Sequence, residues 1–198
     1  MAYNRQNYLQ VLKEQLEPNI LNHSLAVEAC MGGLYDYFES NGLLDTNEPP
    51  REDWLLAGLL HDIDYAGEFK DEHPYKTKEA LEKYGLGAPE AVISIIKAHA
   101  ARYTNEPLDS KADWSIFCCD SLTGLIVAVA LILPSKKLED VKLSSVTKRF
   151  LKQPSFAAGT RRDEVAMCQN PEGLNMPLEK FIEICLNSMK GIVEEVGL

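Results

Sequence analysis

The chain has 198 residues, of which 45% are hydrophobic, and this is enough for one globular domain with a substantial core. Its formal net charge of −10 argues against a nucleic-acid-binding surface, because phosphate contacts need clustered Lys and Arg. The N-terminus is polar without an apolar signal segment, and the five cysteines show no zinc-binding spacing. We therefore expect a cytoplasmic protein with reduced thiols that binds neither nucleic acid nor a membrane.

The apolar residues follow a helical period almost throughout, and we see no alternating strand pattern and no internal repeat. Polar loops are expected at 43–50 and 64–73, and Pro74 is expected at the first position of a helix. The sequence therefore predicts an all-α single domain of about eight or nine helices. In chain order these helices cover about residues 5–16, 20–39, 52–62, 74–84, 89–100, 110–133, 144–152, 160–169 and 177–196.

The strongest apolar stretch, 122–133, has only twelve residues, and Asp120 comes just before it. A transmembrane helix needs about twenty consecutive apolar residues, so this stretch is more typical of a buried core helix. The apolar residues near the C-terminus, around Phe181 and Cys185, are expected to pack against the bundle or, alternatively, to form a dimer face.

The adjacent pair His61-Asp62 ends a nearly all-apolar helix that contains residues 55–60. A buried imidazole and a buried carboxylate are costly unless they are paired or bind a metal. The dipeptide by itself is a weak motif, and its position after an apolar helix makes it informative.

Three other helices each place a metal-ligand type of residue on an apolar face. His23 falls within a stripe that contains Val27 and Cys30, and His99 continues another. Asp120 is expected on the inward face of the long helix, with Ile116, Thr123, Gly124 and Val127. One such residue would be explained by an internal hydrogen bond, but four together favour a metal site.

His23, His61-Asp62 and Asp120 resemble the H…HD…D pattern of HD-domain metal-dependent phosphohydrolases. The similar segments are "NHSLAVEACM", "WLLAGLLHDIDY" and "CCDSLTGLI", and the chain with its "PSFAAGTRRDEV" looks like a bacterial group of predicted HD-superfamily hydrolases. The resemblance implies an all-α HD-type domain over 1–198, with a metal-site core at about 18–130 and a helical extension at about 143–198. It also implies these four residues as metal ligands.

In two-metal members of this superfamily, additional histidines bind a second ion and the HD aspartate, here Asp62, bridges both. His73 and His99 lie at suitable places in the order of the chain. The pair is followed by Ile63-Asp64-Tyr65, so neither the H-D-I-G nor the H-D-x-x-E pattern of two subfamilies is present. Asp64 or Glu68 could supply the carboxylate that the second pattern lacks, or both could be solvated loop residues.

The donor set of imidazoles and carboxylates, without thiolates, suits one or two ions of Mn, Fe, Co, Ni or Zn, and Mg less well. Such ions would activate water for attack on phosphorus, and Asp62 and Arg102 are the expected catalytic residues. Lys97, Lys70 and Lys76 are weaker candidates for holding phosphate, and Arg161 and Arg162 could close over the pocket.

The expected function is hydrolysis of a small phosphate ester, a nucleotide or related metabolite, by metal-activated water. Two alternatives remain open: an HD-fold di-iron oxygenase and a non-catalytic nucleotide-binding module. A small phosphorylated substrate is the expected partner, and a homodimer is possible.

Overall fold

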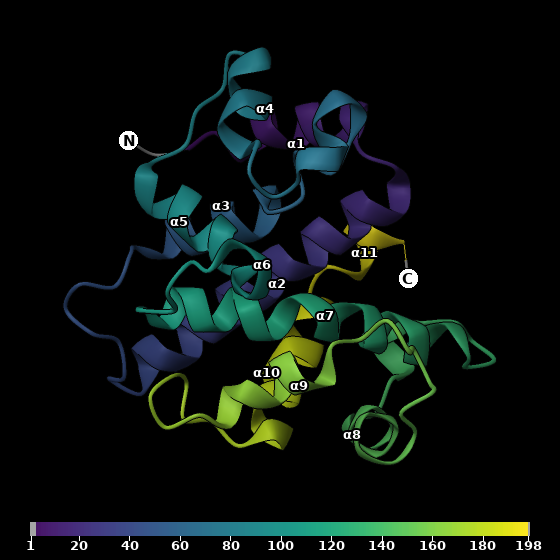
Figure 1. Ribbon diagram of the computed structural model, residues 1–198. Helices are drawn as coiled ribbons and strands as arrows, with labels where there is room; N and C mark the ends of the chain where they lie inside the picture. The colour runs from purple at the N-terminus through teal and green to yellow at the C-terminus, as the bar shows by residue number, and fades with distance from the viewer. Residues whose placement is uncertain (1–2, 198) are drawn as a thin grey trace.

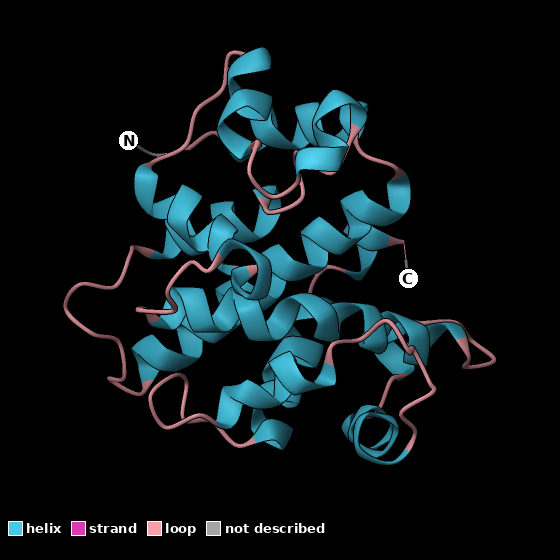
Figure 2. Ribbon diagram, viewed as in Figure 1, coloured by secondary structure: helices cyan, strands magenta, loops and turns pink. Residues whose placement is uncertain are grey.

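The computed structural model describes residues 3–197, and over that range it contains helices and no strand (Figure 2). The predicted all-α class is confirmed. Three of the eleven α-helices have five residues or fewer, which leaves eight longer ones. The helices are α1 (Arg5–Gln15), α2 (Pro18–Ser40), α3 (Arg51–Leu60), η1 (Gly67–Glu72), α4 (Thr77–Lys83), α5 (Glu90–Ala98), α6 (Ala101–Thr104), α7 (Lys111–Leu131), η2 (Leu138–Asp140), α8 (Leu143–Lys152), α9 (Arg162–Ala166), η3 (Met167–Gln169), α10 (Leu178–Lys190) and α11 (Val193–Val196).

Helices α2 and α7 are the centre of the bundle (Figure 1). Helix α2 packs against α3, α7 and α10, while α5 packs against both α3 and α7. Their apolar faces meet in one core in which Leu34, Leu60, Ile96 and Leu122 are fully buried. Burial of this apolar surface is the main stabilising contribution to the arrangement.

Helix α7 is long and apolar enough to span a membrane by length and composition, but most of its apolar window is buried inside the protein. The core helix of a globular protein can be equally long and apolar, and α7 is such a core helix in this structure. Its start agrees with the sequence: Ser110 accepts from the Asp113 backbone N–H, and Asp113 in turn accepts from the Ser110 backbone N–H.

Several predicted boundaries are wrong for local physical reasons. Pro18, expected only to stop the first helix, is the first residue of α2, where its fixed φ and missing N–H are tolerated. Pro74 does not begin a helix, since α4 starts at Thr77 after a turn in which the Lys76 N–H donates to Asp64. The segment 64–73, which was expected to be a loop, contains the 3-10 helix η1.

Helices α10 and α11 pack against α2. Phe181, Ile182 and Cys185 of α10 are buried, and α10 packs on α2, so these residues belong to the core. The expected continuous helix 177–196 is divided into α10 and α11 at Gly191 and Ile192. The expectation that this apolar stretch packs against the bundle, rather than forming a dimer face, therefore holds for most of its residues.

Candidate metal centre

The structure brings all six predicted metal ligands together around Asp62. Three of them belong to central helices or their ends, since His23 lies in α2, Asp120 in α7, and His61 follows the last residue of α3. His99 follows the last residue of α5, and His73 follows η1. The packing of α2 against α3 and α7, and of α5 against both α3 and α7, makes these sequence-distant positions meet.

His23, His61 and Asp62 form a first donor group whose ligand atoms lie within 4.8 Å of one another. Nε2 of His61 lies 3.1 Å from Nε2 of His23 and 3.4 Å from Oδ2 of Asp62. Asp120 adds a further oxygen, because its Oδ1 is 3.0 Å from Nε2 of His23. This group contains the four residues of the H…HD…D pattern.

Asp62, His73 and His99 form a second donor group with the same closeness of ligand atoms. Nε2 of His73 lies 3.5 Å from Oδ1 of Asp62 and 3.2 Å from Nε2 of His99. The two carboxylate oxygens of Asp62 therefore face different groups, Oδ2 toward the first and Oδ1 toward the second. His73 and His99, which the resemblance offered as ligands of a second ion, lie beside Asp62, the aspartate of the HD pair.

Backbone carbonyls orient the two most buried imidazoles. Nδ1 of His61 donates to the carbonyl of Gly58 at 2.8 Å, and Nδ1 of His99 donates to the carbonyl of Ile96. A proton fixed on Nδ1 leaves the lone pair of the neutral ring on Nε2, which in both residues points into the cluster. This use of the second ring nitrogen is typical of metal-binding histidines.

The other two imidazoles are held by the side chains of Thr123 and Asp64, and for Asp64 the sequence left open a role in the site or a solvated loop position. Nδ1 of His23 lies 3.0 Å from Oγ1 of Thr123, and Nδ1 of His73 lies 2.7 Å from Oδ1 of Asp64. Asp64 is completely buried and is therefore no solvated loop residue, whereas Glu68 is exposed and pairs with Lys83. The signal for Asp64 in the sequence was only its place two residues after the HD pair.

The charges of the cluster differ between the two groups. Burial alone would lower the pKa of His61, but the Asp62 and Asp120 carboxylates raise it to about 9. Burial and the neighbouring His61 lower the pKa of His99 to about 4. Burial would raise the pKa values of Asp62 and Asp120, but the surrounding histidines lower both below the usual range. Both aspartates are thus carboxylates at neutral pH, as metal ligands must be.

This donor set fits divalent cations. In each group two imidazole Nε2 atoms face one another at about hydrogen-bond distance. With Nδ1 protonated, Nε2 of neutral His99 carries a lone pair there, and Nε2 of His61 does so once a metal displaces its second proton. Convergent lone pairs and carboxylate oxygens are stabilised by a cation between them. The residues that would hold it are those of the first group with Asp120, and those of the second group.

A cavity of about 550 Å³ opens onto the cluster and is lined by His23, Asp62, His73, His99 and Asp120. Its size is ordinary for a small-molecule site. Tyr65, Tyr75, Tyr103, Arg161 and Glu164 also line it, and the three tyrosines are exposed.

Arg161 is the cationic side chain that reaches the centre. Its guanidinium donates to Oδ2 of Asp120 at 2.5 Å and also to Glu164, which is almost fully buried. Arg102, the arginine expected from the sequence to be catalytic, instead pairs with Asp163 and Glu164 and does not line the cavity. Its predicted role stays untested.

Arg162, adjacent to Arg161, has a different role. It donates to backbone carbonyls of Phe150, Gln153, Phe156 and Ala157 and so holds the loop that precedes α9. The sequence offered both arginines as residues that could close over the pocket, and their different partners show that only Arg161 lines the cavity.

Comparison with known proteins agrees with the geometry. The family model of the HD domain matches residues 20–133, a span that contains all six candidate ligands. No curated protein and no solved structure matched the chain. The HD domain implies a superfamily of metal-dependent hydrolases, most of them phosphohydrolases. The match covers more than half of the chain, which therefore belongs to the HD domain family.

Proposed function

We propose that the protein is a metal-dependent phosphohydrolase that acts on a small phosphate ester and uses two divalent ions. The observation that carries this proposal is the position of Asp62, whose two carboxylate oxygens face two separate groups of imidazoles. A shared carboxylate is the arrangement expected where two ions must lie close enough to act on one substrate.

The six candidate ligands would be shared between the two ions. His23, His61 and Asp120 would hold one ion, His73 and His99 the other, and Asp62 both. Divalent ions so held would lower the pKa of a bound water toward about 7 and polarise a phosphoryl oxygen. Mn, Fe, Co, Ni and Zn suit these ligands, and Mg suits them less.

Arg161 would bind the phosphate. Its guanidinium faces the same cavity as the histidines, it keeps its charge at any working pH, and its forked donors match phosphate oxygens. Glu164 and Asp120 position it in the absence of substrate. We place Arg161 before Arg102 in this role because Arg102 points at the Asp163 and Glu164 carboxylates.

The test is metal analysis of protein purified without chelator, followed by a screen for phosphate release from phosphate esters. Two equivalents of transition metal with turnover of an ester would support the proposal, and one equivalent with turnover would contradict its second ion. No bound metal after reconstitution, or metal without turnover of any ester, would contradict it.

A di-iron oxygenase is the second candidate, because the same pair of donor groups around Asp62 also suits two irons. Iron content and oxygen consumption separate the two reactions. Two equivalents of iron with consumption of O₂, and no phosphate release, would favour the oxygenase.

A further inference from the structure

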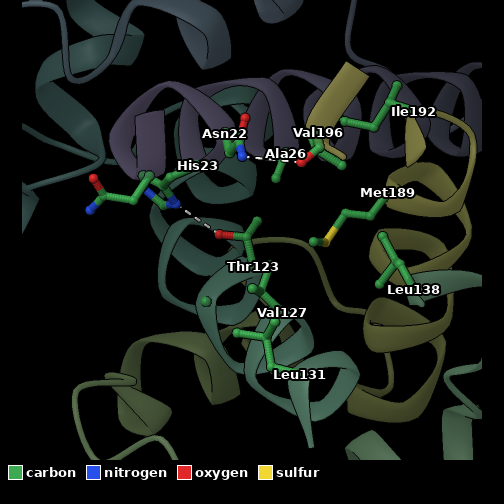
Figure 3. A pocket seen from close by; sticks show the side chains of 12 residues that line it. Asn22, His23, Ala26, Thr123, Val127, Leu131, Leu138, Met189, Ile192 and Val196 are labelled. Atoms are coloured by element: carbon green, nitrogen blue, oxygen red, sulfur yellow. Dashed lines mark hydrogen bonds between the residues drawn. The ribbon is translucent and has the colours of Figure 1, made fainter. Parts of the chain in front are cut away.

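A second cavity lies beside His23 (Figure 3). It has a volume of about 290 Å³ and is enclosed by α2, α7, η2, α10 and α11. In Figure 3, His23 and Thr123 close one end, while Leu138 and Met189 lie at the other. Nε2 of His23 faces Asp120 in the metal centre, and Nδ1 of His23 faces Thr123 in the wall of this cavity.

The walls of this apolar cavity select against a polar ligand. Its lining is mostly aliphatic and includes Ala26, Val127, Leu138, Met189, Ile192 and Val196, with no charged and no aromatic side chain other than the imidazole of His23. A nucleobase would find no aromatic side chain to stack on at the end lined by Leu138 and Met189.

Two of the polar side chains in the wall already have partners in the protein. Asn22 donates to the carbonyl of Val196 at 3.1 Å, and Thr123 donates to the carbonyl of Asp120 at 2.8 Å. A ligand that needed hydrogen bonds would have to replace these contacts, whereas an aliphatic ligand would leave them intact.

A third opening, of about 340 Å³, borders both the apolar cavity and the metal cavity. That opening is lined by Asp120 and Arg161, shares His23 with both other cavities, and shares Gly124 with the apolar one. Arg161 thus borders both the metal cavity and the passage toward the aliphatic walls.

Gly124 lines both the apolar cavity and the adjoining opening. The sequence placed it on the buried face of α7, but the structure leaves it exposed, and a Cβ built there would meet nothing within 4 Å. Glycine within a helix is less stable than alanine, and no neighbouring atom requires it here. The missing side chain leaves room where the apolar cavity borders that opening.

We propose that the apolar cavity binds an aliphatic chain carried by the phosphate ester, with the phosphate at the metal centre and the chain passing Gly124. This inference rests on the proposed function. A volume of about 290 Å³ corresponds to roughly ten water-sized groups at ~30 Å³ each, so the chain is of medium length. The substrate is then an alkyl or acyl phosphate ester rather than the nucleotide that the sequence suggested.

The experiment compares two phosphonates that cannot be hydrolysed, methylphosphonate and n-octylphosphonate, by titration calorimetry on the Mn-reconstituted protein. Each methylene moved out of water contributes up to about four-fold in affinity. Burial of only a few of them should make octylphosphonate bind about 100-fold more tightly than methylphosphonate. Nucleoside monophosphates are measured in the same way.

Two variants at one position locate the chain. Gly124→Leu should fill the passage and bring the octyl-to-methyl affinity ratio close to one. Gly124→Ala adds a single methyl group at the same backbone position and should keep most of the ratio. Both are good helix formers, and the unobstructed Cβ position allows either to fold.

A ratio near one in the wild-type protein, or an equal ratio in wild type and Gly124→Leu, would overturn the inference. Failure of both phosphonates to bind, or tighter binding of a nucleoside monophosphate than of octylphosphonate, would overturn it as well. A chain-length ratio that Gly124→Leu removes, together with no phosphate release from octyl phosphate, would support the apolar cavity while contradicting the hydrolase.

Discussion

The two donor groups around Asp62 are built in different ways. The first group takes His23 from within α2, Asp120 from within α7, and His61 from the end of α3. The second takes His73 from the irregular segment after η1, where Asp64 holds it. Helix packing alone brings the first group together, whereas the second also needs a particular loop conformation. The first group is therefore positioned by helix packing, and the second depends on the contact between His73 and the buried carboxylate of Asp64.

The largest effect of a substitution on metal binding and activity is expected at Asp62, which belongs to both donor groups. Asp62→Ala removes an oxygen from each group, so we expect loss of bound metal and a fall in phosphate release below about one-hundredth of wild type. Metal analysis, circular dichroism and the phosphate assay check this, with the exposed Asp71→Ala as control. Full metal content and turnover in Asp62→Ala would contradict the assignment of the site.

Arg161 lies on the side of the first group, through its contact with Asp120. Arg161→Ala should lower kcat/KM for a phosphate ester by about 10- to 100-fold, the size expected for a charged hydrogen bond, with metal retained. Arg102→Ala is the matched variant, and we expect a smaller loss because Arg102 does not line the cavity. A larger loss in Arg102→Ala than in Arg161→Ala would restore Arg102 as the catalytic arginine.

Asp64→Asn separates the two groups. It keeps the shape of the side chain but removes the carboxylate that faces Nδ1 of His73, so the second ion should bind about 10- to 100-fold more weakly. The first ion should be unaffected. Metal titration by calorimetry measures both steps, and Glu68→Gln, at an exposed carboxylate paired with Lys83, should change neither. Equal weakening of both ions in Asp64→Asn would show that the groups are not independent.

The first group should depend on the close approach of α3 to α2. A Cβ at Gly58 would lie 2.8 Å from Cα and 2.9 Å from N of Glu28, so the backbones would have to separate. We expect Gly58→Ala to lower the free energy of unfolding by about 1–3 kcal/mol, measured by denaturant unfolding of metal-free protein. Gly124→Ala, where the Cβ is unobstructed, should instead raise it by up to about 1 kcal/mol. Equal stability of the two variants would argue against the tight contact.

The groups should also differ in the pH dependence of metal binding. In the metal-free protein the raised pKa of His61, about 9, keeps its proton at neutral pH, and a metal must displace it. Affinity at the first group should therefore rise about tenfold per pH unit up to pH 9. The lowered pKa of His99, about 4, leaves that ligand already neutral. In a titration at pH 7, binding at the first group should release the proton of His61, whereas His99 has no proton to release at the second group. Equal proton release in the two binding steps would contradict the difference.

Much of the fold and of the first group could be predicted from the sequence. The 3.6-residue period around His23, the apolar residues before His61 and the polar Asp120 in an apolar helix all report burial on a helix face. Burial of such residues implies partners, so four of them together predicted the metal site. The predicted helix ends at about 39 and 110 also lie within one residue of the end of α2 and the start of α7.

Other features depended on contacts between residues far apart in the chain. Asp64 and Glu68 are equivalent in the sequence, as are Arg161 and Arg162, and only the tertiary structure shows which of each pair faces the site. The passage beside Gly124 has the same origin, because it exists only where α7 meets α2 and the C-terminal helices. Residue type and period by themselves determined which side chains are buried on helices. The directions of loop side chains and the shapes of cavities were decided by long-range packing, which no local pattern encodes.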